Sequence, residues 1–427
     1  MNVKLKSKFL IVIFIFLLIS PIFSQWTCRS KLGGYLKPIK KKSHLFWAAE
    51  TTFGYGFMTD RSIKNAMIFI GADYSKKNYQ FYFEGGTKAW GNSLNGPDQY
   101  SNNSKKGPMK IFQKQRFGIR EGFYRYNNKK DKILTLGFHS MNFGDYLLVN
   151  ERGLGLSYIQ KVKDFQLNVT GASVLKDFSR FGSFCSVHYL YNILYDRELA
   201  YVGQGVGETN FAGLVFKWMP SGKKKSSSDD EFNEFSSSKK KKQVLKELGI
   251  VVYNEFGTGI DNLRTHYGLM SMIELPLKIK VKYEILNQNA IDNKAVIYHV
   301  KASKQFNFAS KGQLFIQLGY FNKIDIDDNA MVYTSFSNLF IGEVMRMDMM
   351  DIPLYQFAAK HRIPKWKLHV KLQATQQFTD ENISEYDLAI GKTFFKRAKL
   401  TTMFSRMEAD VLDETYYMAR AELRITF

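Results

Sequence analysis

The sequence contains little cysteine, little proline and, beyond its first residues, no long apolar run. The 427 residues include 2 cysteines, Cys28 and Cys185, and 8 prolines. Two cysteines are too few for a disulfide scaffold, and we expect this pair to lie too far apart to be bridged. After residue 24, no apolar run reaches the roughly 20 residues of a membrane-spanning helix. If the chain after residue 24 is inserted into a membrane, it must therefore cross it with strands.

Motifs of the common catalytic and metal centres are also missing. The sequence contains no Gly-x-Ser-x-Gly elbow and no His-Glu-x-x-His motif. Its 7 histidines are dispersed, and Asp325, Asp327 and Asp328 lack the spacing of a calcium-binding loop. We therefore expect a protein that is not an enzyme and that has no metal or other cofactor.

The N-terminal residues have the layout of a secretory signal. Lysines at positions 4, 6 and 8 precede an apolar run from Phe9 to Ile19, and Ser24 offers a cleavage position before Gln25. A basic segment, an apolar core and a small residue at the cleavage point define such signals. We expect residues 1–24 to be a cleaved signal peptide and residues 25–46 to be a periplasmic N-terminal segment.

The rest of the sequence is rich in aromatic residues and alternates between apolar and polar positions. Aromatic residues make up 15% of the chain, with 24 tyrosines and 36 phenylalanines. One face of the last predicted strand carries Tyr417, Ala419, Ala421, Leu423, Ile425 and Phe427. The opposite face carries Tyr416, Met418, Arg420, Glu422, Arg424 and Thr426. Such a division suits a strand with one side in lipid and the other in water.

The alternation predicts about eighteen strands of about 10 to 13 residues, a length that a tilted membrane strand needs and that exceeds the usual 5 to 6 of globular strands. A soluble sandwich would also alternate, but with shorter strands. We therefore predict an all-β, transmembrane, antiparallel up-and-down β-barrel over residues 47–427, with both ends of the chain in the periplasm. The predicted strands lie near residues 47–58, 64–75, 78–90, 112–126, 131–141, 153–162, 164–176, 208–219, 246–256, 265–275, 277–286, 294–307, 311–322, 352–362, 365–377, 383–394, 396–407 and 413–427.

The predicted connections are short on one side and long on the other. The short ones, assigned to the periplasm, lie near residues 76–78, 162–164, 275–277 and 362–364. The long ones, assigned to the outside, include residues 91–110, 177–207 and 323–351. Residues 221–246 break the rule, because this Lys/Ser-rich low-complexity segment falls on the periplasmic side. It is typical of a solvated linker, and a docking segment for an anionic or protein partner is the alternative.

The signal, the alternating strands and the C-terminal segment together resemble the porin-type outer-membrane channels of Gram-negative bacteria, including the eighteen-stranded sugar channels and the alginate-export channel. In particular, Tyr417, Leu423, Ile425 and Phe427 look like the signal that such proteins present to the barrel-assembly machinery. The resemblance covers nearly all of the mature chain but is architectural, so no substrate-binding motif can be transferred. It implies an outer-membrane location and a lipid environment.

Under the alternation, basic side chains are predicted to project into the lumen. These pore-lining candidates are Arg116, Arg120, Lys278, Lys280, Lys282, Lys365, Lys367, His369, Lys371, Lys399, Arg420 and Arg424. Rings of positive charge favour anions, and the net charge of +22 has the same sign. The alternative is that these residues pair across strands with Glu84, Glu274, Glu284, Asp387 and Glu422 and only keep the lumen hydrated.

Two functions are compatible with this pattern. The first is a diffusion channel for small hydrophilic, preferentially anionic solutes, because eighteen strands enclose more space than side chains alone fill. The second is a plugged accessory barrel that serves a larger envelope assembly, since residues 177–207 and 323–351 are long enough to fold inward. The methionine-rich run at 339–350 would prefer burial or a partner protein. Neither reading involves nucleic acid.

Overall fold

The computed structural model describes residues 45–58, 61–94, 110–128, 131–143, 148–174, 209–220, 244–257, 263–291, 293–308, 312–328, 330, 353–377, 382–394, 398–410 and 415–426. Both cysteines, residues 1–44, Phe427 and most of the segment 221–246 lie outside this part. The predictions made for them are therefore not addressed by the structure.

The described chain consists of 18 strands and two short 3-10 turns. The strands are β1 (Leu45–Met58), β2 (Arg61–Lys76), β3 (Tyr79–Leu94), β4 (Lys110–Asn127), β5 (Lys132–Phe143), β6 (Val149–Val162), β7 (Phe165–Val174), β8 (Thr209–Trp218), β9 (Leu245–Gly257), β10 (Arg264–Leu275), β11 (Ile279–Asn289), β12 (Ala295–Asn307), β13 (Gln313–Asp325), β14 (Leu354–Ile363), β15 (Leu368–Gln377), β16 (Ile383–Phe394), β17 (Ala398–Ala409) and β18 (Tyr416–Thr426). The turns are η1 (Pro276–Lys278) and η3 (Pro364–Trp366).

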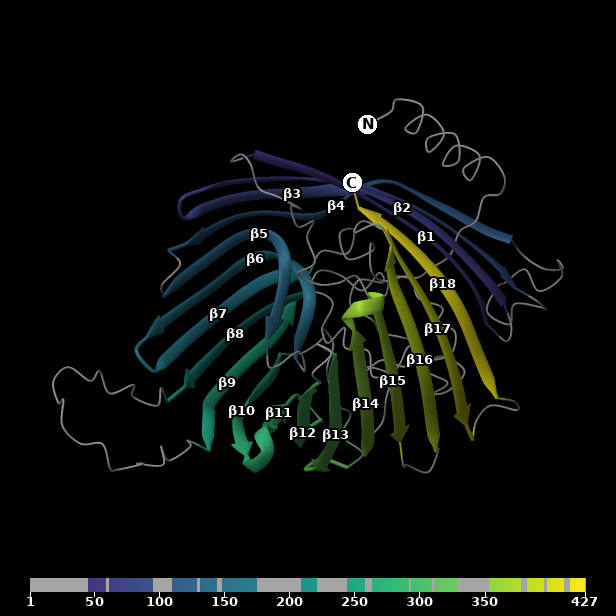
Figure 1. Ribbon diagram of the computed structural model, residues 1–427. Coiled ribbons are helices and arrows are strands. Elements are labelled where there is room, and N and C mark those ends of the chain that lie inside the picture. Colours follow the sequence, from purple (N-terminus) through teal and green to yellow (C-terminus); the bar gives the residue numbers. More distant parts are fainter. Residues whose placement is uncertain are drawn as a thin grey trace, which may run out of the picture.

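The strands form one closed antiparallel barrel, and Figure 1 shows them following one another around a single ring. Each strand pairs with its neighbours in sequence, and β18 returns to pair with β1 from Glu50 opposite Thr426 to Met58 opposite Met418. The predicted architecture and strand number are confirmed. In the described residues no helix is long and apolar enough to cross a membrane.

The two ends of the barrel differ in their connections. We call the end that carries Leu45 and Thr426 the terminal end, and the opposite end the loop end. At the terminal end β2 and β3, and likewise β6 and β7, are joined by two-residue turns centred on Lys77 and Lys163, whose φ angles are 50° and 54°. The predicted short turns are therefore present.

Successive residues of each strand point to opposite sides, as the pleat requires. In β11 the side chains of Tyr283 and Ile285 are 36% and 45% exposed, whereas those of Glu284 and Leu286 are 4% and 0% exposed. Because paired residues on neighbouring strands point to the same side, the same alternation holds all around the barrel. The exposed apolar side chains cover the outer surface, and the alternate positions face the lumen.

Aromatic side chains gather near both ends of the outer surface. Near the terminal end, the ring of Tyr124 lies 6.1 Å from that of Tyr79 and 5.0 Å from that of Phe81. Near the loop end, the ring of Tyr320 lies 5.9 Å from that of Tyr298 and 4.7 Å from that of Tyr355. Two aromatic belts around an apolar surface are typical of a barrel that stands in lipid.

Two of the strands that begin later than predicted do so because a proline turn precedes them. Strand β15 starts at Leu368 rather than at residue 365, because Pro364 opens a 3-10 turn that ends at Lys367 with a φ of 51°. Likewise β11 starts at Ile279, after a turn in which Leu277 and Lys278 have φ angles of 62° and 61°. Proline lacks the N–H that a strand ladder uses, so the chain reverses at these points.

Candidate functional site: the barrel lumen

The lumen wall is built from the inward positions of all strands, which the pairing aligns into rows. In one such row Lys282 of β11 lies opposite Met272 of β10 and Lys301 of β12. The next row toward the loop end places Glu284 opposite Met270 and His299. The register therefore decides which side chains share the lumen and at what depth.

Basic side chains of strands β8 to β18 line the lumen near the terminal end, and we call this set the basic region. Its members are Lys217, Lys280, Lys282, Lys301, Lys360, Arg362, His369, Lys371, Lys399, Arg420 and Arg424. Lys280, Lys282, Lys360 and Arg362 are exposed, and the others are half-buried. The register thus directs seven of the sequence-predicted candidates inward. Their role in permeation remains a prediction.

Four members of the basic region were missed in the sequence analysis, namely Lys217, Lys301, Lys360 and Arg362. All four lie in strands that the sequence predicts, at inward positions of the same alternation. Lys360 stands directly opposite Lys371, and Arg362 stands opposite His369. Extending the period-two pattern to every strand would therefore have found them.

Three predicted candidates do not have the placement that the sequence suggested, and the prediction for two others is not addressed by the structure. Lys278, Lys365 and Lys367 lie in the exposed turns η1 and η3 and their ends, where the strand alternation no longer applies. Arg116 and Arg120 lie in β4 at two register shifts against β3, so neither has a directly opposed partner there. Their side chains lie outside what the structure describes.

Acidic side chains neutralise part of the basic region. The Lys217 Nζ lies 2.6 Å from the Glu247 carboxylate, and both side chains are about a fifth exposed. Near the same end, Lys246 Nζ lies 3.7 Å from Glu274. Glu274 also stands opposite Lys280, and Glu422 opposite Thr401. Acidic residues therefore neutralise Lys217 and Lys246, but basic residues outnumber acidic ones in this region, and cross-strand pairing of the predicted candidates stays a prediction.

Farther toward the loop end, the inward carboxylates are almost completely buried. These are Glu84, Glu121, Glu255, Glu284, Glu385 and Asp387, each between 0% and 4% exposed. On β11, for example, the inward side chains change from exposed Lys280 and Lys282 to buried Glu284 toward the loop end. Together with the apolar cluster described below, these carboxylates form what we call the covered region.

Hydrogen bonds from neighbouring side chains hold several of these carboxylates. Tyr82 donates its hydroxyl to Glu84 at 2.9 Å, and Ser405 donates to Asp387 at 2.6 Å. Glu255 accepts from the hydroxyl of Tyr253 at 3.0 Å and lies 3.6 Å from the Arg264 guanidinium. A buried carboxylate needs such partners because its desolvation is costly.

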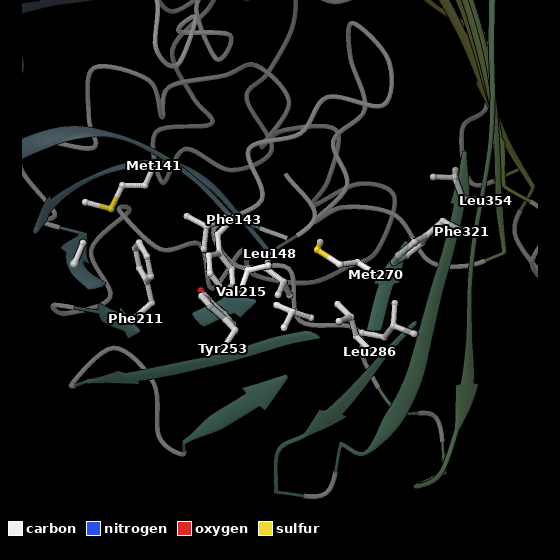
Figure 2. Close-up of a cluster of buried hydrophobic side chains, with 14 residues drawn as sticks. Met141, Phe143, Leu148, Phe211, Val215, Tyr253, Met270, Leu286, Phe321 and Leu354 are labelled. Carbon is white, nitrogen blue, oxygen red and sulfur yellow. The ribbon is translucent and has the colours of Figure 1, made fainter. Parts of the chain in front are cut away.

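An apolar cluster occupies the lumen side of β5 to β14 (Figure 2). Its members are Met141, Phe143, Leu148, Val149, Ala172, Phe211, Val215, Val251, Tyr253, Met270, Leu286, Ile297, Phe321 and Leu354, all at most 9% exposed. An aqueous lumen is normally lined by polar side chains. Buried apolar side chains at inward positions show that this part of the wall does not face open water.

The end of the β5–β6 hairpin contributes to this cluster. The ring of Phe143 lies over Gly213 of β8, where an added Cβ would meet the ring at 2.5 Å. The same ring is 5.7 Å from that of Tyr253, and Leu148 at the start of β6 is 1% exposed. Glycine at 213 permits this close approach. The hairpin end thus packs across the inner face of neighbouring strands.

The described residues contain no group of three or more histidine, cysteine, aspartate or glutamate side chains that could hold a metal. The four inward histidines have ordinary partners where these are defined. His139 contacts the Ser157 hydroxyl at 3.0 Å, and His266 contacts Gln288 at 3.3 Å. Asp327 accepts a hydrogen bond from the backbone N–H of Lys294 at 2.8 Å. In the described residues these polar side chains are therefore held by ordinary hydrogen bonds.

Two solved structures have a similar fold over nearly the whole chain. The crystal structure of OccK5 (OpdH) from Pseudomonas aeruginosa has a TM-score of 0.52 at 9% sequence identity, with 90% of this chain and 98% of that chain covered. OccK7 (OpdD) from the same organism has a TM-score of 0.51 at 10% identity, with 90% and 99% covered. Neither a protein-family model nor a curated protein sequence matches. The similarity shows a porin-like β-barrel fold.

Proposed function

We propose that this chain is an outer-membrane channel for small hydrophilic solutes, with a preference for anions. The observation that supports it best is the basic region, which presents exposed and half-buried cations on the inner wall of a closed 18-stranded barrel. In this proposal residues 1–24 direct export, residues 25–46 lie in the periplasm, and residues 221–246 form a periplasmic linker. The barrel-assembly machinery inserts the barrel by recognising the strand that carries Tyr417, Leu423 and Ile425.

The mechanism follows from electrostatics in a narrow, water-filled space. Cations on a low-dielectric wall raise the local concentration of anions and lower that of small cations. Because Lys280 and Lys282 remain exposed, an anion could replace part of its hydration shell with ammonium groups and leave again without a large desolvation cost. Binding that is weak and repeated along the wall suits passage rather than capture. No catalytic step is part of the proposal.

The covered region sets the width of the path in this proposal. Phe143 and Leu148 pack inward against β8 and β9, which narrows the space available to a solute on that side. A solute would then pass beside the covered region rather than through it. A constriction next to a wide charged vestibule favours small solutes over large ones.

The second candidate is a plugged accessory barrel that serves an envelope assembly. One observation favours it, namely that Val251, Tyr253 and Leu286 face the lumen yet are fully buried. If the same covering extends over the whole cross-section, no continuous water path exists. The two candidates therefore differ in a single measurable property, the conductance of the purified barrel.

Planar-bilayer recording separates the two candidates and tests the basic region. Discrete conductance steps are expected, and under a salt gradient the reversal potential should favour chloride over potassium. The variant Lys280→Glu/Lys282→Glu/Lys371→Glu should weaken or reverse this preference, since the changed side chains lie in the basic region. Absence of conductance in the parent protein would favour the plugged barrel.

The matched control is Lys278→Glu/Lys365→Glu/Lys367→Glu, which changes the same charge in the turns at the terminal end. It should alter selectivity much less than the lumen variant, because the turn charges lie outside the lumen, where salt screens their effect on the permeating ion. Equal effects of the two variants would contradict a role for the lumen wall.

A further inference from the structure

The outer surface of the barrel carries lysines near its terminal end. Lys76, Lys132, Lys304 and Lys392 occupy outward positions there, on the same side as the exposed apolar residues of their strands. Lys76, Lys132 and Lys392 are exposed, and Lys304 is half-buried. Among the described outward positions in the terminal half of the strands, none carries an acidic side chain. This part of the surface is therefore positively charged without compensation from its own outward face.

Aromatic rings support two of these lysines. The Lys304 Nζ lies 4.5 Å from the centroid of the Phe306 ring, and the Lys392 Nζ lies 5.4 Å from that of Phe394. A lysine stem that lies along apolar surface and ends at the edge of the lipid is the arrangement known as snorkelling. It places the ammonium group at the depth of the lipid headgroups.

The turns at the same end carry five further lysines, together with the half-buried Asp131 and Asp164. Lys77, Lys163, Lys278, Lys365 and Lys367 are all exposed there. Two large apolar side chains stand beside them, since Leu277 is 73% and Trp366 is 61% exposed. Exposed tryptophan and leucine next to lysine are typical of a protein surface at the membrane–water interface. We call these five lysines and the four outward ones the basic rim.

The loop end of the outer surface is different. Its outward positions carry neutral polar residues such as Asn254, Thr265 and Asn322 and the charged pair Arg406–Glu408, whose side chains bond to each other, and the register also places Lys64 and Arg152 there. No net charge results from that pair. The two ends of the outer surface therefore differ in acidic residues, because among the described outward positions only the loop end carries one, Glu408.

We propose that the basic rim binds the phosphate groups of anionic phospholipids in the membrane leaflet at the terminal end. This inference rests on the membrane insertion that the proposed function assumes, but not on conductance. Each lysine near an anionic lipid surface contributes a favourable electrostatic interaction, and the rim supplies nine around one end of the barrel. The exposed Trp366 and Leu277 anchor the turns at the same depth. The rim would thereby fix the depth and direction of the barrel in the membrane.

Lipid is favoured over a soluble anionic polymer because of where the lysines lie. Lys304 and Lys392 project from lipid-facing positions between apolar neighbours, where a polymer in the periplasm could not reach them without displacing lipid. A phospholipid satisfies both parts of the surface, since its chains cover the apolar belt and its phosphate meets the ammonium groups. A purely soluble anion would leave the apolar part uncovered.

Trp366 provides a local probe for this proposal. The full chain would be reconstituted in phosphatidylcholine vesicles that contain either brominated phosphatidylglycerol or brominated phosphatidylcholine, both of which quench nearby tryptophan. The fluorescence of the Trp366→Phe variant, which comes from the other tryptophans, is subtracted from that of the parent protein. We expect phosphatidylglycerol to associate with the site about fivefold more strongly than phosphatidylcholine, the factor that corresponds to about one lysine-phosphate interaction.

Variants then test whether the rim is responsible. The variant Lys365→Gln/Lys367→Gln/Lys392→Gln should lose the preference, so that phosphatidylglycerol and phosphatidylcholine associate about equally. The same three changes to Arg should retain the preference for phosphatidylglycerol. The matched control Lys360→Gln/Lys371→Gln/Lys399→Gln removes equal charge from the lumen of the same sector and should leave the preference intact. Heat-modifiable mobility on gels confirms that each barrel is folded.

Three outcomes would overturn the proposal. These are no preference in the parent protein, an unchanged preference in the Gln variant of the rim, and an equal loss in the lumen control. The last would mean that the overall charge, rather than the rim, attracts the lipid. Failure of the proposed channel function is distinguishable, because a barrel without conductance would still show the lipid preference.

Discussion

The basic region and the covered region share strands β8, β11, β12 and β14 and follow the same alternation, yet they differ in exposure and in chemistry. On β11, Lys280 and Lys282 are exposed, and two positions farther along Glu284 is 4% exposed. On β8, half-buried Lys217 follows Phe211 and Val215, which are 2% exposed. A charged side chain is stable in the basic region because water solvates it. In the covered region, a polar side chain needs hydrogen-bond partners, and the remaining positions are apolar. An inward position is therefore not by itself a pore-lining position.

The largest difference between the two regions should appear on truncation. Phe211→Ala removes a buried ring from the covered region, and large aromatic-to-alanine changes in packed cores cost about 3 to 5 kcal/mol of folding free energy. Lys371→Ala in the basic region should cost less than about 0.5 kcal/mol. Urea unfolding in lipid vesicles measures both values. If Phe211→Ala were as mild as Lys371→Ala, the apolar cluster would not be a packed core.

A smaller difference should separate the two faces of a single strand. Leu372 is 49% exposed on the outer surface, and adjacent Lys371 points into the lumen. Leu372→Arg places a charge in lipid and should cost about 2 to 4 kcal/mol near the midplane. Lys371→Arg keeps its charge in water and should be close to neutral. The same unfolding assay compares them, and a reversed order would mean that the register of β15 is wrong by one residue.

The smallest effect is expected inside the basic region itself. The Lys217–Glu247 pair is only partly screened from solvent, so Lys217→Ala should destabilise the barrel by about 0.2 to 1 kcal/mol. A double-mutant cycle with Glu247→Ala isolates the coupling, which should decrease at high salt. A coupling well above this range would place the pair in a drier environment than the rest of the basic region.

Much of the fold could be predicted from the sequence because the strand period is strictly two. Each of the 18 strands lies where the alternation predicts it, with most boundaries shifted by a few residues. The largest functional errors, at Lys278, Lys365 and Lys367, came from carrying the alternation through Pro276 and Pro364. A proline at a strand start signals a turn, so these errors could have been reduced.

Other features of the lumen could not be predicted from the amino-acid sequence. Nothing in the local sequence distinguishes Glu284, which is buried, from Glu274, which is half-buried, since both follow the inward pattern. The contact of Phe143 with Gly213 joins residues about seventy positions apart. Likewise Lys217 meets Glu247 only because β8 and β9 are neighbours in the barrel.

The sequence by itself determined the class of this protein, namely strands long enough to cross a membrane, with one apolar and one polar side, in an even number. These properties are local, since each depends on the period of a short segment and on the length of lipid that it must span. Tertiary structure alone decided which inward residues meet water and which are covered. That division depends on the depth of each residue along the barrel and on what packs against it from distant parts of the chain, and no short segment contains either quantity.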